Sequence, residues 1–357
     1  MDQKILDILS KFDLPGKVLG AKQFGNGHIN WTYDVKVDDG SRYVLQRINT
    51  YVFRDPVGLM RNIELLTDFM LEKADDPRSV LRLIKTHDGK TYTVTEDDEY
   101  WRMYDFVDSI CYDAAETLDL FRECGAGYGN FQNLLADFPV EKLIETIPNF
   151  HNTVSRYEDF EQAVREDRSK RAVNAKRDID YAMSERPFAP FFMEKQAAGL
   201  IPLRVTHNDT KINNVLFDKK TNKALCVVDL DTTMPGFAAV DFGDCIRYSA
   251  SGAPEDEQDL SKVFLHMDLF KAFAEGFCGT AAKNLTADEL LLCPEAAKLV
   301  TIETGIRFLG DYLNGDVYFH IDYPDQNLAR ARAQFKLASD MDARMEDMRD
   351  VIKRVIE

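Results

Sequence analysis

The strongest constraint on this chain is a polar segment that leads directly into two short apolar ones. The polar segment carries Asp209 and Asn214, five positions apart, and the apolar runs cover 215–217 and 224–230. Two short apolar runs separated by turn residues predict a β-hairpin. The second run ends around Asp229, so the exit of the hairpin carries a carboxylate. We therefore expect the side-chain oxygens of Asp209, Asn214 and Asp229 to converge on one point.

Three such oxygens suit the transfer of a phosphoryl group. In kinase-like folds, one aspartate accepts the proton of the attacking hydroxyl, while an asparagine and a second aspartate hold the magnesium ion that bridges the phosphates. Magnesium prefers hard oxygen ligands and keeps several waters, so one Asn and one Asp suffice beside a nucleotide. The pattern predicts Asp209 as the catalytic base and Asn214 and Asp229 as metal ligands.

The alternative is that these polar residues are scattered over an ordinary hairpin, and any single pair carries little weight. The whole pattern is more specific. His207 precedes Asp209 by two positions, the asparagine follows five after the aspartate, and the strand-end acid follows twenty after it. The histidine is expected to have a structural role, with its ring bonded to nearby backbone. We favour phosphoryl transfer over coincidence.

Bulk properties define the setting of this chemistry. The 357 residues leave room for two lobes, each with its own core. The formal net charge of −17 argues against a nucleic-acid or anionic-membrane partner. No apolar run reaches membrane-spanning length, and the first residues lack the pattern of a signal peptide. The six cysteines are scattered without a CxxC pair, so we expect buried thiols in a cytoplasmic protein of unknown oligomeric state.

The N-terminal part of the sequence predicts a small antiparallel sheet. An amphipathic helix is expected over 4–12, and a second helix begins at the pair Asp55-Pro56, where an N-cap precedes a proline at the first helical position. Short segments of alternating polarity are separated by turn residues. The expected strands cover 18–24, 31–37, 42–48 and parts of 80–106.

A glycine-rich tip joins the first two expected strands. Gly25, Asn26 and Gly27 form this tip, and glycine amides can approach phosphates closely because no Cβ stands in the way. A plain turn is the commoner meaning of two glycines at a hairpin. The tip becomes a candidate nucleotide contact because the loop around Asp209 requires a cover for the phosphates.

The third expected strand lacks the lysine that pairs with the phosphates in protein kinases. Gln46 occupies the usual place of that lysine, next to Leu45, and Arg47 carries the charge. Strand alternation puts the two side chains on opposite faces, so only one of them can point at the nucleotide. The sequence leaves both possibilities open.

Aromatic residues end the N-terminal part. Tyr104 and Phe106 stand in a segment, 104–108, that fits the hinge between two lobes. A hinge offers backbone groups and aromatic area to an adenine ring, so both residues are candidate nucleotide contacts. The alternative is that they are ordinary core aromatics on an inner strand.

From residue 113 onward the chain takes on a helical character. The glycines within 118–138 cost helix stability, so we expect them to allow close packing on a neighbouring helix. Asp241 is expected at a helix start, from which it can brace the loop. These patterns predict an α+β protein with an N-lobe over 1–106 and a mainly helical C-lobe over 107–357. Further helices are expected in a solvated insert over 141–178 and over 257–280, 286–315 and 328–356.

The loop and strand end resemble the aminoglycoside phosphotransferase-like kinases, which also include choline, homoserine and fructosamine kinases. Their signature is a His-Gly-Asp-x-x-x-x-Asn loop followed by an Ile-Asp strand end, and here Asn208 stands in the place of the glycine. That departure requires an unusual backbone angle at Asn208. The resemblance implies a bilobal, protein-kinase-like fold.

A narrower resemblance links the chain to the N-acetylhexosamine 1-kinases and extends through nearly its whole length. It includes a glutamine in the place of the lysine, which makes the missing lysine a subfamily trait. The segments that carry it are 25–30, 43–46, 204–211, 229–232 and 307–309.

This resemblance implies ATP- and Mg²⁺-dependent phosphorylation of the anomeric hydroxyl of N-acetylglucosamine or N-acetylgalactosamine. Two alternatives remain: a kinase of another small hydroxyl substrate, such as an aminoglycoside, choline or homoserine, and a pseudokinase that binds nucleotide without transfer. The sugar pocket implied by the resemblance is lined by His28, Asp209, Asp229, Thr232, Arg307 and Tyr318.

Overall fold

The computed structural model of the protein describes residues 2–24 and 30–357. The glycine-rich tip therefore lies outside the described residues. The residues outside this description thus include four that the sequence predicts to contact nucleotide or sugar, namely Gly25, Asn26, Gly27 and His28.

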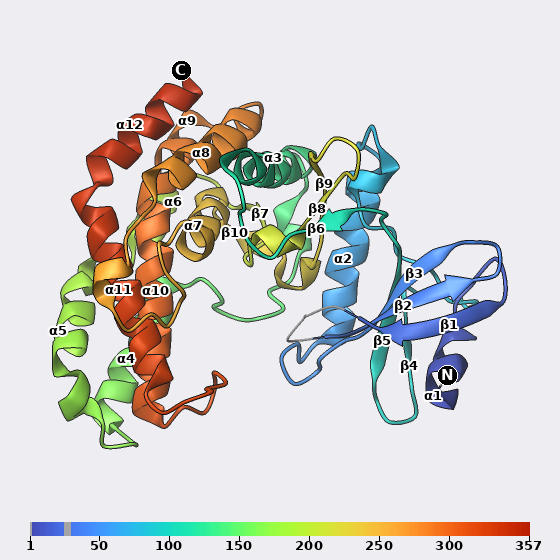
Figure 1. Cartoon of the computed structure of the whole chain (residues 1–357), viewed down its shortest axis with the longest axis horizontal. Coiled ribbons are helices and arrows are strands. Elements are labelled where there is room, and N and C mark those ends of the chain that lie inside the picture. Colours follow the sequence, from blue (N-terminus) through green and yellow to red (C-terminus); the bar gives the residue numbers. More distant parts are fainter. Residues whose placement is uncertain (1, 25–29) are drawn as a thin grey trace. The chain divides into compact units, whose positions relative to one another are not determined.

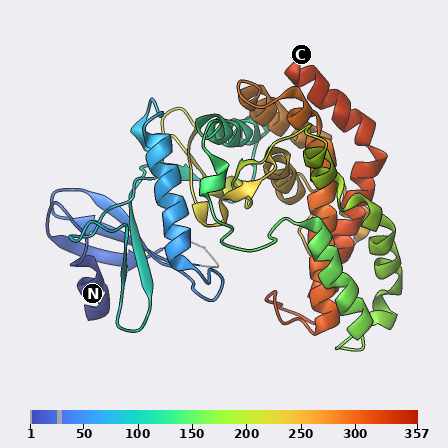
Figure 2. The same ribbon diagram turned by 180° about the vertical axis from the view of Figure 1, so that it is seen from behind.

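The chain divides into two compact units, each made of segments that are distant in sequence (Figures 1 and 2). The domain boundary expected between residues 106 and 107 stays a prediction. The first unit consists of Met1–Ile110, Glu141–Ile147 and Leu216–Met234, and the second of Cys111–Val140, Pro148–Val215 and Pro235–Glu357.

The first unit contains the predicted antiparallel sheet, which has five strands in the order β1-β2-β3-β5-β4. Helix α1 (Gln3–Leu9) precedes the sheet and α2 (Pro56–Leu71) follows β3. Asp55 caps α2, since its side chain accepts a hydrogen bond from the amide of Gly58, as the Asp-Pro pair predicted. The strands are β1 (Val18–Gln23), β2 (Trp31–Val37), β3 (Arg42–Arg47), β4 (Tyr92–Val94) and β5 (Tyr100–Asp105).

One face of this sheet forms the core of the first unit together with α1. Val35, Leu45 and Met103 come from three neighbouring strands and are fully buried, and Ile8 and Leu9 of α1 pack in the same cluster. The alternation along each strand sends the intervening side chains to the other face. That other face carries polar residues that are important for the candidate site.

Two later segments complete the first unit. The segment Glu141–Ile147 is joined to α2 by a pair of hydrogen bonds: Asn62 Nδ2 donates to the Ile144 carbonyl at 2.8 Å, and the Ile144 amide donates to Asn62 Oδ1 at 3.1 Å. The predicted hairpin is also present, with Asn222 at its turn in the left-handed region (φ 57°). Its strands are β8 (Val215–Phe217) and β9 (Ala224–Val227), which pair in a small sheet of order β6-β8-β9 with β6 (Ile110–Cys111).

The second unit is mainly helical, and α10 is its central element. The side chains of α10 are buried along almost its whole length, because α4, α7 and α11 all pack against it. Figure 2 shows α10 and α11 side by side. A two-stranded ladder of β7 (Arg204–Thr206) and β10 (Met234–Gly236) precedes α7. The helices are α3 (Leu118–Leu134), α4 (Thr153–Glu166), α5 (Lys176–Glu185), α6 (Phe191–Ala197), α7 (Ala238–Ser249), α8 (Met267–Ala281), α9 (Ala287–Leu291), α10 (Cys293–Asn314), α11 (Gln326–Ala343) and α12 (Met345–Ile356).

Two of the three glycines of α3, Gly125 and Gly129, have the expected role. A Cβ built at Gly125 would lie 2.5 Å from the carbonyl oxygen of Phe273, and one at Gly129 would lie 2.7 Å from that of Phe277. Both carbonyls belong to α8, so the backbones of α3 and α8 approach each other at a distance that only glycine permits. Gly276 of α8 has the reciprocal role, since its Cβ would lie 1.9 Å from the Arg122 carbonyl oxygen.

Two helical expectations for the C-terminal half need correction. The residues before α8 do not continue that helix: the amides of Gly252 and His266 bond to Phe264 and Ala250, so 250–266 folds back on itself. The single C-terminal helix is two helices that meet at Arg344, because α11 packs on α10 whereas α12 packs on α8. One apolar stripe in the sequence does not reveal such a change of partner.

The insert over 141–178 is not a set of solvated helices. Tyr157 and Phe160 of α4 are buried in the cluster around α10. The insert also supplies the segment that joins α2 of the first unit. Because the insert contains many charged residues, the few apolar positions that pack against the rest of the protein could not be recognised from the sequence.

The cysteines are free thiols, and five of them are buried as expected. Cys111 is the exception because it is exposed. No helix among the described residues is long and apolar enough to cross a membrane.

The close contact between α3 and α8 predicts opposite effects for two glycines on one helix. Gly276→Ala forces a methyl group against the backbone of α3 and should lower the free energy of unfolding by about 3 kcal/mol or more. Gly279→Ala is the matched control, because its Cβ would meet only Val355 at 3.9 Å. Gly279→Ala should raise the free energy of unfolding by about 0.5–1 kcal/mol, because alanine has a higher helix propensity than glycine. Urea unfolding, monitored by far-UV circular dichroism, measures the free energy of unfolding of both variants. Equal changes in the two variants would contradict the close contact between α3 and α8 at Gly276.

Candidate active site

The loop that carries Asp209 is held by two carboxylates of α7. Asp241 Oδ2 accepts a hydrogen bond from the His207 amide at 2.9 Å, and Asp241 Oδ1 accepts one from the Asn208 amide at 2.8 Å. Asp244 Oδ2, one turn further along, accepts one from the Thr210 amide at 2.9 Å. Asp241 lies in the first turn of α7, as predicted, where the helix dipole favours a negative charge. The helix start therefore fixes the path of the loop backbone.

The remaining amides of the loop are also bonded. The Asp209 amide donates to His207 Nδ1 at 3.3 Å, which confirms the structural role expected for that histidine. The Lys211 amide donates to the Tyr128 hydroxyl at 3.0 Å, and that hydroxyl donates to the Lys211 carbonyl at 2.8 Å. Gln132 of α3 bonds to Asp241 Oδ2 at 3.0 Å. Every amide from 207 to 211 therefore has a partner supplied by a side chain, and most of these side chains are distant in sequence.

Asn208 has the unusual backbone angle that the sequence required, with φ at 65°. Asparagine tolerates this left-handed region better than most residues. Its side chain is also fixed, since Oδ1 accepts from the Thr206 hydroxyl at 2.9 Å and Nδ2 donates to the Thr206 carbonyl at 3.1 Å. An asparagine thus replaces the glycine of the family signature without opening the loop.

Asp209 and Asn214, both in the second unit, lie together. Asn214 Nδ2 donates to the backbone carbonyl of Asp209 at 2.9 Å. This bond orients the amide, and no donor among residues 2–24 and 30–357 binds Asn214 Oδ1. A hard oxygen ligand for a divalent cation is therefore available beside Asp209, whose side chain is one quarter exposed.

Lys211 is a partner of Asp209 that sequence reasoning did not identify. Its Nζ lies 2.6 Å from Asp209 Oδ1. Burial acts to lower the pKa of Lys211, but the carboxylate of Asp209 outweighs burial and raises it. A charged lysine beside the predicted base lowers the repulsion between that base and an approaching phosphate. The position of Lys211 two residues after Asp209 is the sequence feature from which this contact could have been predicted.

His151 is a second residue that the sequence did not assign. Its Nδ1 lies 2.8 Å from Glu303 Oε1 and its Nε2 lies 3.3 Å from the Asn208 carbonyl oxygen. Glu303 is buried, and its pKa is lowered because His151 and the Thr153 hydroxyl outweigh the effect of burial. Both partners of the ring are therefore acceptors, so both ring nitrogens must carry a proton. Burial alone would lower the pKa of His151, but Glu303 outweighs it and raises the pKa.

Asp229, the second predicted metal ligand, belongs to the first unit. It has φ at 61° and directly precedes a short 3-10 helix, Leu230–Thr232. Thr232, a predicted sugar contact, is buried in the same turn. The approach of Asp229 to Asp209 and Asn214 stays a prediction, because Asp209 and Asn214 are in the other unit.

In the first unit, Gln46 and Arg47 lie on opposite faces of β3, as expected. Arg47 stacks on the Trp31 ring at 3.5 Å and pairs with Glu99 at 2.7 Å. Gln46 Oε1 accepts two hydrogen bonds from Arg102, from Nε at 3.1 Å and from Nη2 at 2.9 Å. Arg102 stands directly opposite Gln46 on β5. The face that carries Gln46 therefore has a cation, supplied by the neighbouring strand.

Arg102 is fully buried and was missed by the sequence analysis. Its guanidinium pairs with Asp231 through both terminal nitrogens, and Asn30 donates to the same carboxylate at 2.6 Å. Burial acts to lower the pKa of Arg102, but the charge of Asp231 outweighs it and raises the pKa. An arginine inside an otherwise apolar strand was the signal for this buried pair.

The predicted hinge aromatics are already engaged within the first unit. Tyr104 is buried, and burial is the main cause that raises the pKa of its hydroxyl. The ring of Phe106 has the Arg42 guanidinium at 3.6 Å from its centroid. A contact of either residue with adenine stays a prediction.

Arg307 and the segment that carries Tyr318 lie together in the second unit. The Arg307 guanidinium is 5.6 Å from the centroid of Phe319 and 5.8 Å from that of Phe150. Arg307 is partly buried, and within the described part of the chain no carboxylate lies within ion-pair distance of it, although its charge helps to lower the pKa of Glu303, one turn earlier on α10. Tyr318 is 70% exposed, and Asp311 fixes its backbone amide at 2.9 Å.

A carboxylate on a braced loop, with an amide oxygen beside it, is the arrangement expected of a phosphotransferase. A family model described as the phosphotransferase enzyme family matches residues 20–270. Because this match covers more than half of the chain, the protein belongs to that family.

Solved structures give the same fold at low identity. An aminoglycoside phosphotransferase from Alicyclobacillus acidocaldarius is 14% identical, with 99% of this chain and 97% of that chain covered and a TM-score of 0.67. An amicoumacin kinase is 14% identical (94% and 93% covered, TM-score 0.60), and a microcompartment-associated aminopropanol kinase is 15% identical (97% and 98% covered, TM-score 0.59). The predicted α+β, protein-kinase-like fold is confirmed, with a small antiparallel sheet in the N-terminal part and a helical remainder.

The doubly protonated ring of His151 predicts a pH-dependent contribution to stability. A group whose pKa is raised by folding stabilises the protein fully below its unfolded pKa, and this stabilisation is lost as pH rises through the folded pKa. His151→Gln should therefore lower the free energy of unfolding by about 3 kcal/mol at pH 6, where a buried pair is broken, and by less at pH 9.

The measurement is urea unfolding of wild type and variant between pH 6 and pH 9. His320→Gln serves as the control, because the side chain of His320 is 88% exposed. A difference between wild type and His151→Gln that does not change with pH would show that the ring is not charged in the folded protein.

Proposed function

We propose that this protein is an ATP- and Mg²⁺-dependent kinase that phosphorylates the anomeric hydroxyl of N-acetylhexosamines. The observation that carries the proposal is the braced loop, in which Asp209 lies beside Lys211 and Asn214 with every backbone amide bonded. Such a loop holds a base in a fixed position, and fixed position is the main contribution of a protein to phosphoryl transfer.

In the proposed reaction, Asp209 accepts the proton of the sugar hydroxyl as its oxygen attacks the γ-phosphorus of ATP. The bond from that phosphorus to the β,γ-bridging oxygen breaks, and ADP leaves. Lys211 is the nearby cation that offsets the negative charge of the phosphate. His151 keeps the backbone beside Asp209 in place.

The residues present fit a magnesium ion. Asn214 Oδ1 is a hard oxygen without a donor among the described residues, and Asp229 would supply a carboxylate. When bound, the ion would neutralise charge on the phosphates. The amicoumacin kinase structure contains AMP-PNP and Ca²⁺, which is consistent with a nucleotide and a divalent cation here.

The first unit would hold the nucleotide. Gln46 is the stronger of the two candidates for the place of the missing lysine, because Arg102 orients its amide and adds a positive charge to its face. Arg47 lies on the opposite face of β3, where its guanidinium stacks on Trp31 and pairs with Glu99. The tip Gly25-Asn26-Gly27 would cover the phosphates, and Tyr104 and Phe106 would approach the adenine.

The acceptor would be a neutral, hydroxylated molecule. No carboxylate of the described residues lies within ion-pair distance of Arg307, and its positive charge would repel the ammonium groups of aminoglycosides or amino alcohols. A sugar hydroxyl or an acetamido oxygen can accept its hydrogen bonds. His28, Asp229, Thr232 and Tyr318 would complete the pocket. We place the enzyme in the cytoplasm, with the sugar and ATP as its partners.

Asp209→Asn tests the proposed base. Turnover should fall by about three orders of magnitude, while ATP still binds, because the amide cannot accept the proton. Phosphorylation is measured on N-acetylglucosamine, N-acetylgalactosamine, kanamycin, choline and homoserine. The control Asp13→Asn removes a carboxylate whose side chain is 79% exposed. Near-normal turnover in Asp209→Asn would exclude it as the base, and wild-type binding of ATP without transfer to any acceptor would favour the pseudokinase alternative.

Arg307→Gln tests the class of acceptor. Loss of the guanidinium should raise KM for the N-acetylhexosamine about tenfold or more, with a smaller change in kcat, because hydrogen bonds to the substrate are lost. The control Arg354→Gln removes a cation whose Nε donates to the Asp350 carbonyl of its own helix. If Arg307→Gln instead improves the use of kanamycin or choline and leaves sugar kinetics unchanged, the neutral-sugar assignment is wrong.

A further inference from the structure

A buried network in the first unit joins a candidate nucleotide residue to the turn that follows a candidate metal ligand. Its centre is Arg102 of β5, which is 1% exposed. The Arg102 guanidinium donates two hydrogen bonds to Gln46 Oε1, from Nε at 3.1 Å and from Nη2 at 2.9 Å, and it pairs with both carboxylate oxygens of Asp231. In the sequence, Gln46 is 56 positions and Asp231 is 129 positions from Arg102. One planar group with donors in fixed directions therefore connects two distant segments of the chain.

Asp231 fastens the short 3-10 helix Leu230–Thr232 to the sheet. Its side chain is 3% exposed, and Oδ2 accepts one hydrogen bond from Arg102 Nη2 at 2.9 Å and another from Asn30 Nδ2 at 2.6 Å. Its backbone carbonyl accepts one from the Thr146 hydroxyl at 3.4 Å. All of these residues belong to the first unit. The turn is therefore held through the side chain of Asp231 and through its backbone.

Asp229 stands directly before this turn, and its backbone conformation depends on the segments around it. Its φ of 61° and ψ of 59° lie in the left-handed region, which costs free energy for a residue with a side chain. Such a conformation persists where the surrounding structure holds it. On one side β9 is paired with β8, and on the other side Asp231 fastens the turn to Arg102. The direction of the Asp229 carboxylate therefore depends on the ion pair formed two residues later.

The charge of Asp229 also acts on the guanidinium. Burial acts to lower the pKa of Arg102, whereas the charge of Asp231 raises it, with a smaller contribution from the charge of Asp229. In protein kinases, a carboxylate of the helix after the third strand aligns the phosphate-binding lysine. Here the carboxylate that aligns Arg102 and Gln46 comes from the segment that carries the candidate metal ligand.

A contribution to stability alone is a weak reason for this buried pair. Removing two charges from water costs much of what their attraction returns, so a buried ion pair is often no more stabilising than apolar residues of the same size. The pair does fix directions, because Arg102 holds the amide of Gln46 on one side and the carboxylate of Asp231 on the other. The geometry therefore favours a positioning role over a purely structural one.

We propose that Arg102 and Asp231 are positioning residues that fix the carboxylate of Asp229 relative to Gln46, so that a magnesium ion and the phosphates are received by one preassembled element of the first unit. Arg102 and Asp231 are almost fully buried, so they act through Asp229 and Gln46. The proposal rests on the proposed function, since it takes Asp229 as a metal ligand and Gln46 as a nucleotide contact.

Equilibrium binding of AMP-PNP to the full-length protein tests the proposal without any turnover. Calorimetric titrations are made with MgCl₂ and with EDTA, and the magnesium gain is defined as the Kd in EDTA divided by the Kd in MgCl₂. A partly unfolded variant binds more weakly by the same factor under both conditions, so its magnesium gain stays unchanged. The magnesium gain therefore separates a displaced carboxylate from a general loss of stability.

Asp231→Asn is the decisive variant, because it keeps the shape of the side chain and removes the charge that holds the turn to Arg102. The magnesium gain should be about tenfold or more in wild type and about threefold or less in Asp231→Asn, because a displaced ligand loses most of its interaction. Asp229→Asn removes the carboxylate itself and should give the same low magnesium gain. The Kd of Asp231→Asn in EDTA should stay close to that of wild type, because Arg102 still orients Gln46.

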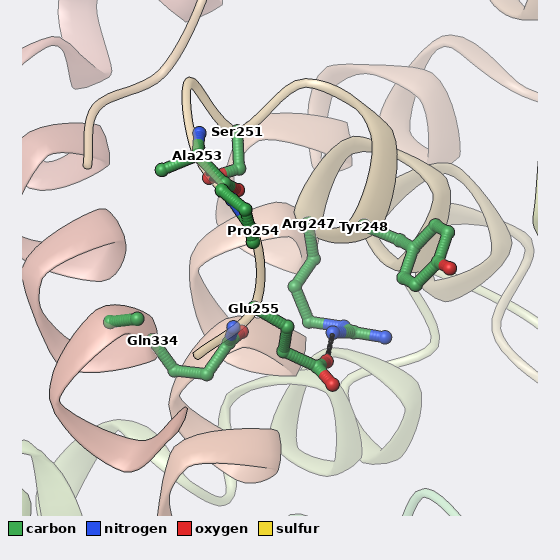
Figure 3. A pocket seen from close by; sticks show the side chains of 8 residues that line it. Arg247, Tyr248, Ser251, Ala253, Pro254, Glu255 and Gln334 are labelled. Carbon is green, nitrogen blue, oxygen red and sulfur yellow. Dashed lines mark hydrogen bonds and ion pairs between the residues drawn. The ribbon is translucent and has the colours of Figure 1, made fainter. Parts of the chain in front are cut away.

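Glu255→Gln is the matched control, since it also takes a carboxylate from a buried arginine. Arg247 is 8% exposed and donates from Nη1 to Glu255 Oε1 at 2.8 Å. Figure 3 shows this ion pair at the end of α7, in the wall of a cavity of about 330 Å³ in the second unit. Glu255→Gln should weaken folding and leave the magnesium gain at its wild-type value.

A second variant decides the question if Asp231→Asn does not fold, since that variant leaves the charge of Arg102 buried without its carboxylate. Arg102→Met combined with Asp231→Asn removes both charges, so no buried charge is left unpaired. Its magnesium gain should also be about threefold or less. Its Kd in EDTA should rise as well, because Gln46 loses the two hydrogen bonds that orient it.

The outcomes separate this proposal from the proposed function. A wild-type magnesium gain that persists in Asp231→Asn, or in the double variant, would overturn this proposal alone. Equal Kd values in MgCl₂ and EDTA for wild type would remove the metal role of Asp229 from the proposed function and this proposal with it. Loss of the magnesium gain in Asp231→Asn, in a protein whose wild type phosphorylates no acceptor, would support this proposal and contradict only the proposed reaction.

Discussion

The candidate site depends on two carboxylates, those of Asp241 and Asp244, which accept hydrogen bonds from the amides of the loop before them. A loop of this length has no regular secondary structure to satisfy its backbone, and buried amides without partners are costly. By placing two acids one turn apart, the start of α7 provides acceptors at the spacing that the loop requires. The position of Asp209 then follows from the backbone, and the loop does not have to be ordered when a substrate arrives.

Several buried charged groups of the described residues are paired with an opposite charge, and this pairing determines which of them remain charged. Asp244 has a lowered pKa because Arg247, His151 and Lys211 outweigh its burial, whereas the pKa of Asp241 is raised mainly by burial. Arg102 remains charged beside Asp231 in the same way. Arg307 differs from them, since it is only partly buried and no carboxylate of the described residues lies within ion-pair distance of it, although its charge helps to lower the pKa of Glu303. This difference supports the proposal that Arg307 contacts the acceptor.

The two units use buried arginines in different ways. In the first unit, Arg102 orients Gln46, the residue that we propose takes the place of the missing strand lysine. In the second unit, Arg247 joins the end of α7 to the following loop and closes a cavity. Both arginines make several hydrogen bonds in fixed directions, which a lysine could not do with one flexible ammonium group. The guanidinium groups of these two arginines therefore hold neighbouring side chains in place in addition to supplying positive charge.

Local patterns in the sequence predicted much of the fold. The strands of the N-terminal sheet, the start of α2 and the hairpin after the loop all follow from short-range periodicity, caps and turn residues. Gly125 and Gly129 of α3 were also interpreted correctly, because the cost of a glycine in a helix requires a compensating contact. The predictions failed where one stripe of apolar residues serves two partners, as in α11 and α12, or where charged residues surround a few buried aromatics, as in α4.

The sequence by itself determined that Asp209 and Asn214 lie close together in the loop, since only five positions separate them along the chain. It also determined that Gln46 and Arg47 face opposite ways, because strand alternation is a local property. Only the tertiary structure decided that His151 is a cation, because its partner Glu303 lies 152 positions away. The same reason applies to Arg102 and Asp231, which are 129 positions apart. The packing of the folded chain determines which charged residues pair when buried. Because such partners are far apart in the sequence and follow no fixed spacing, local sequence patterns do not predict these pairs.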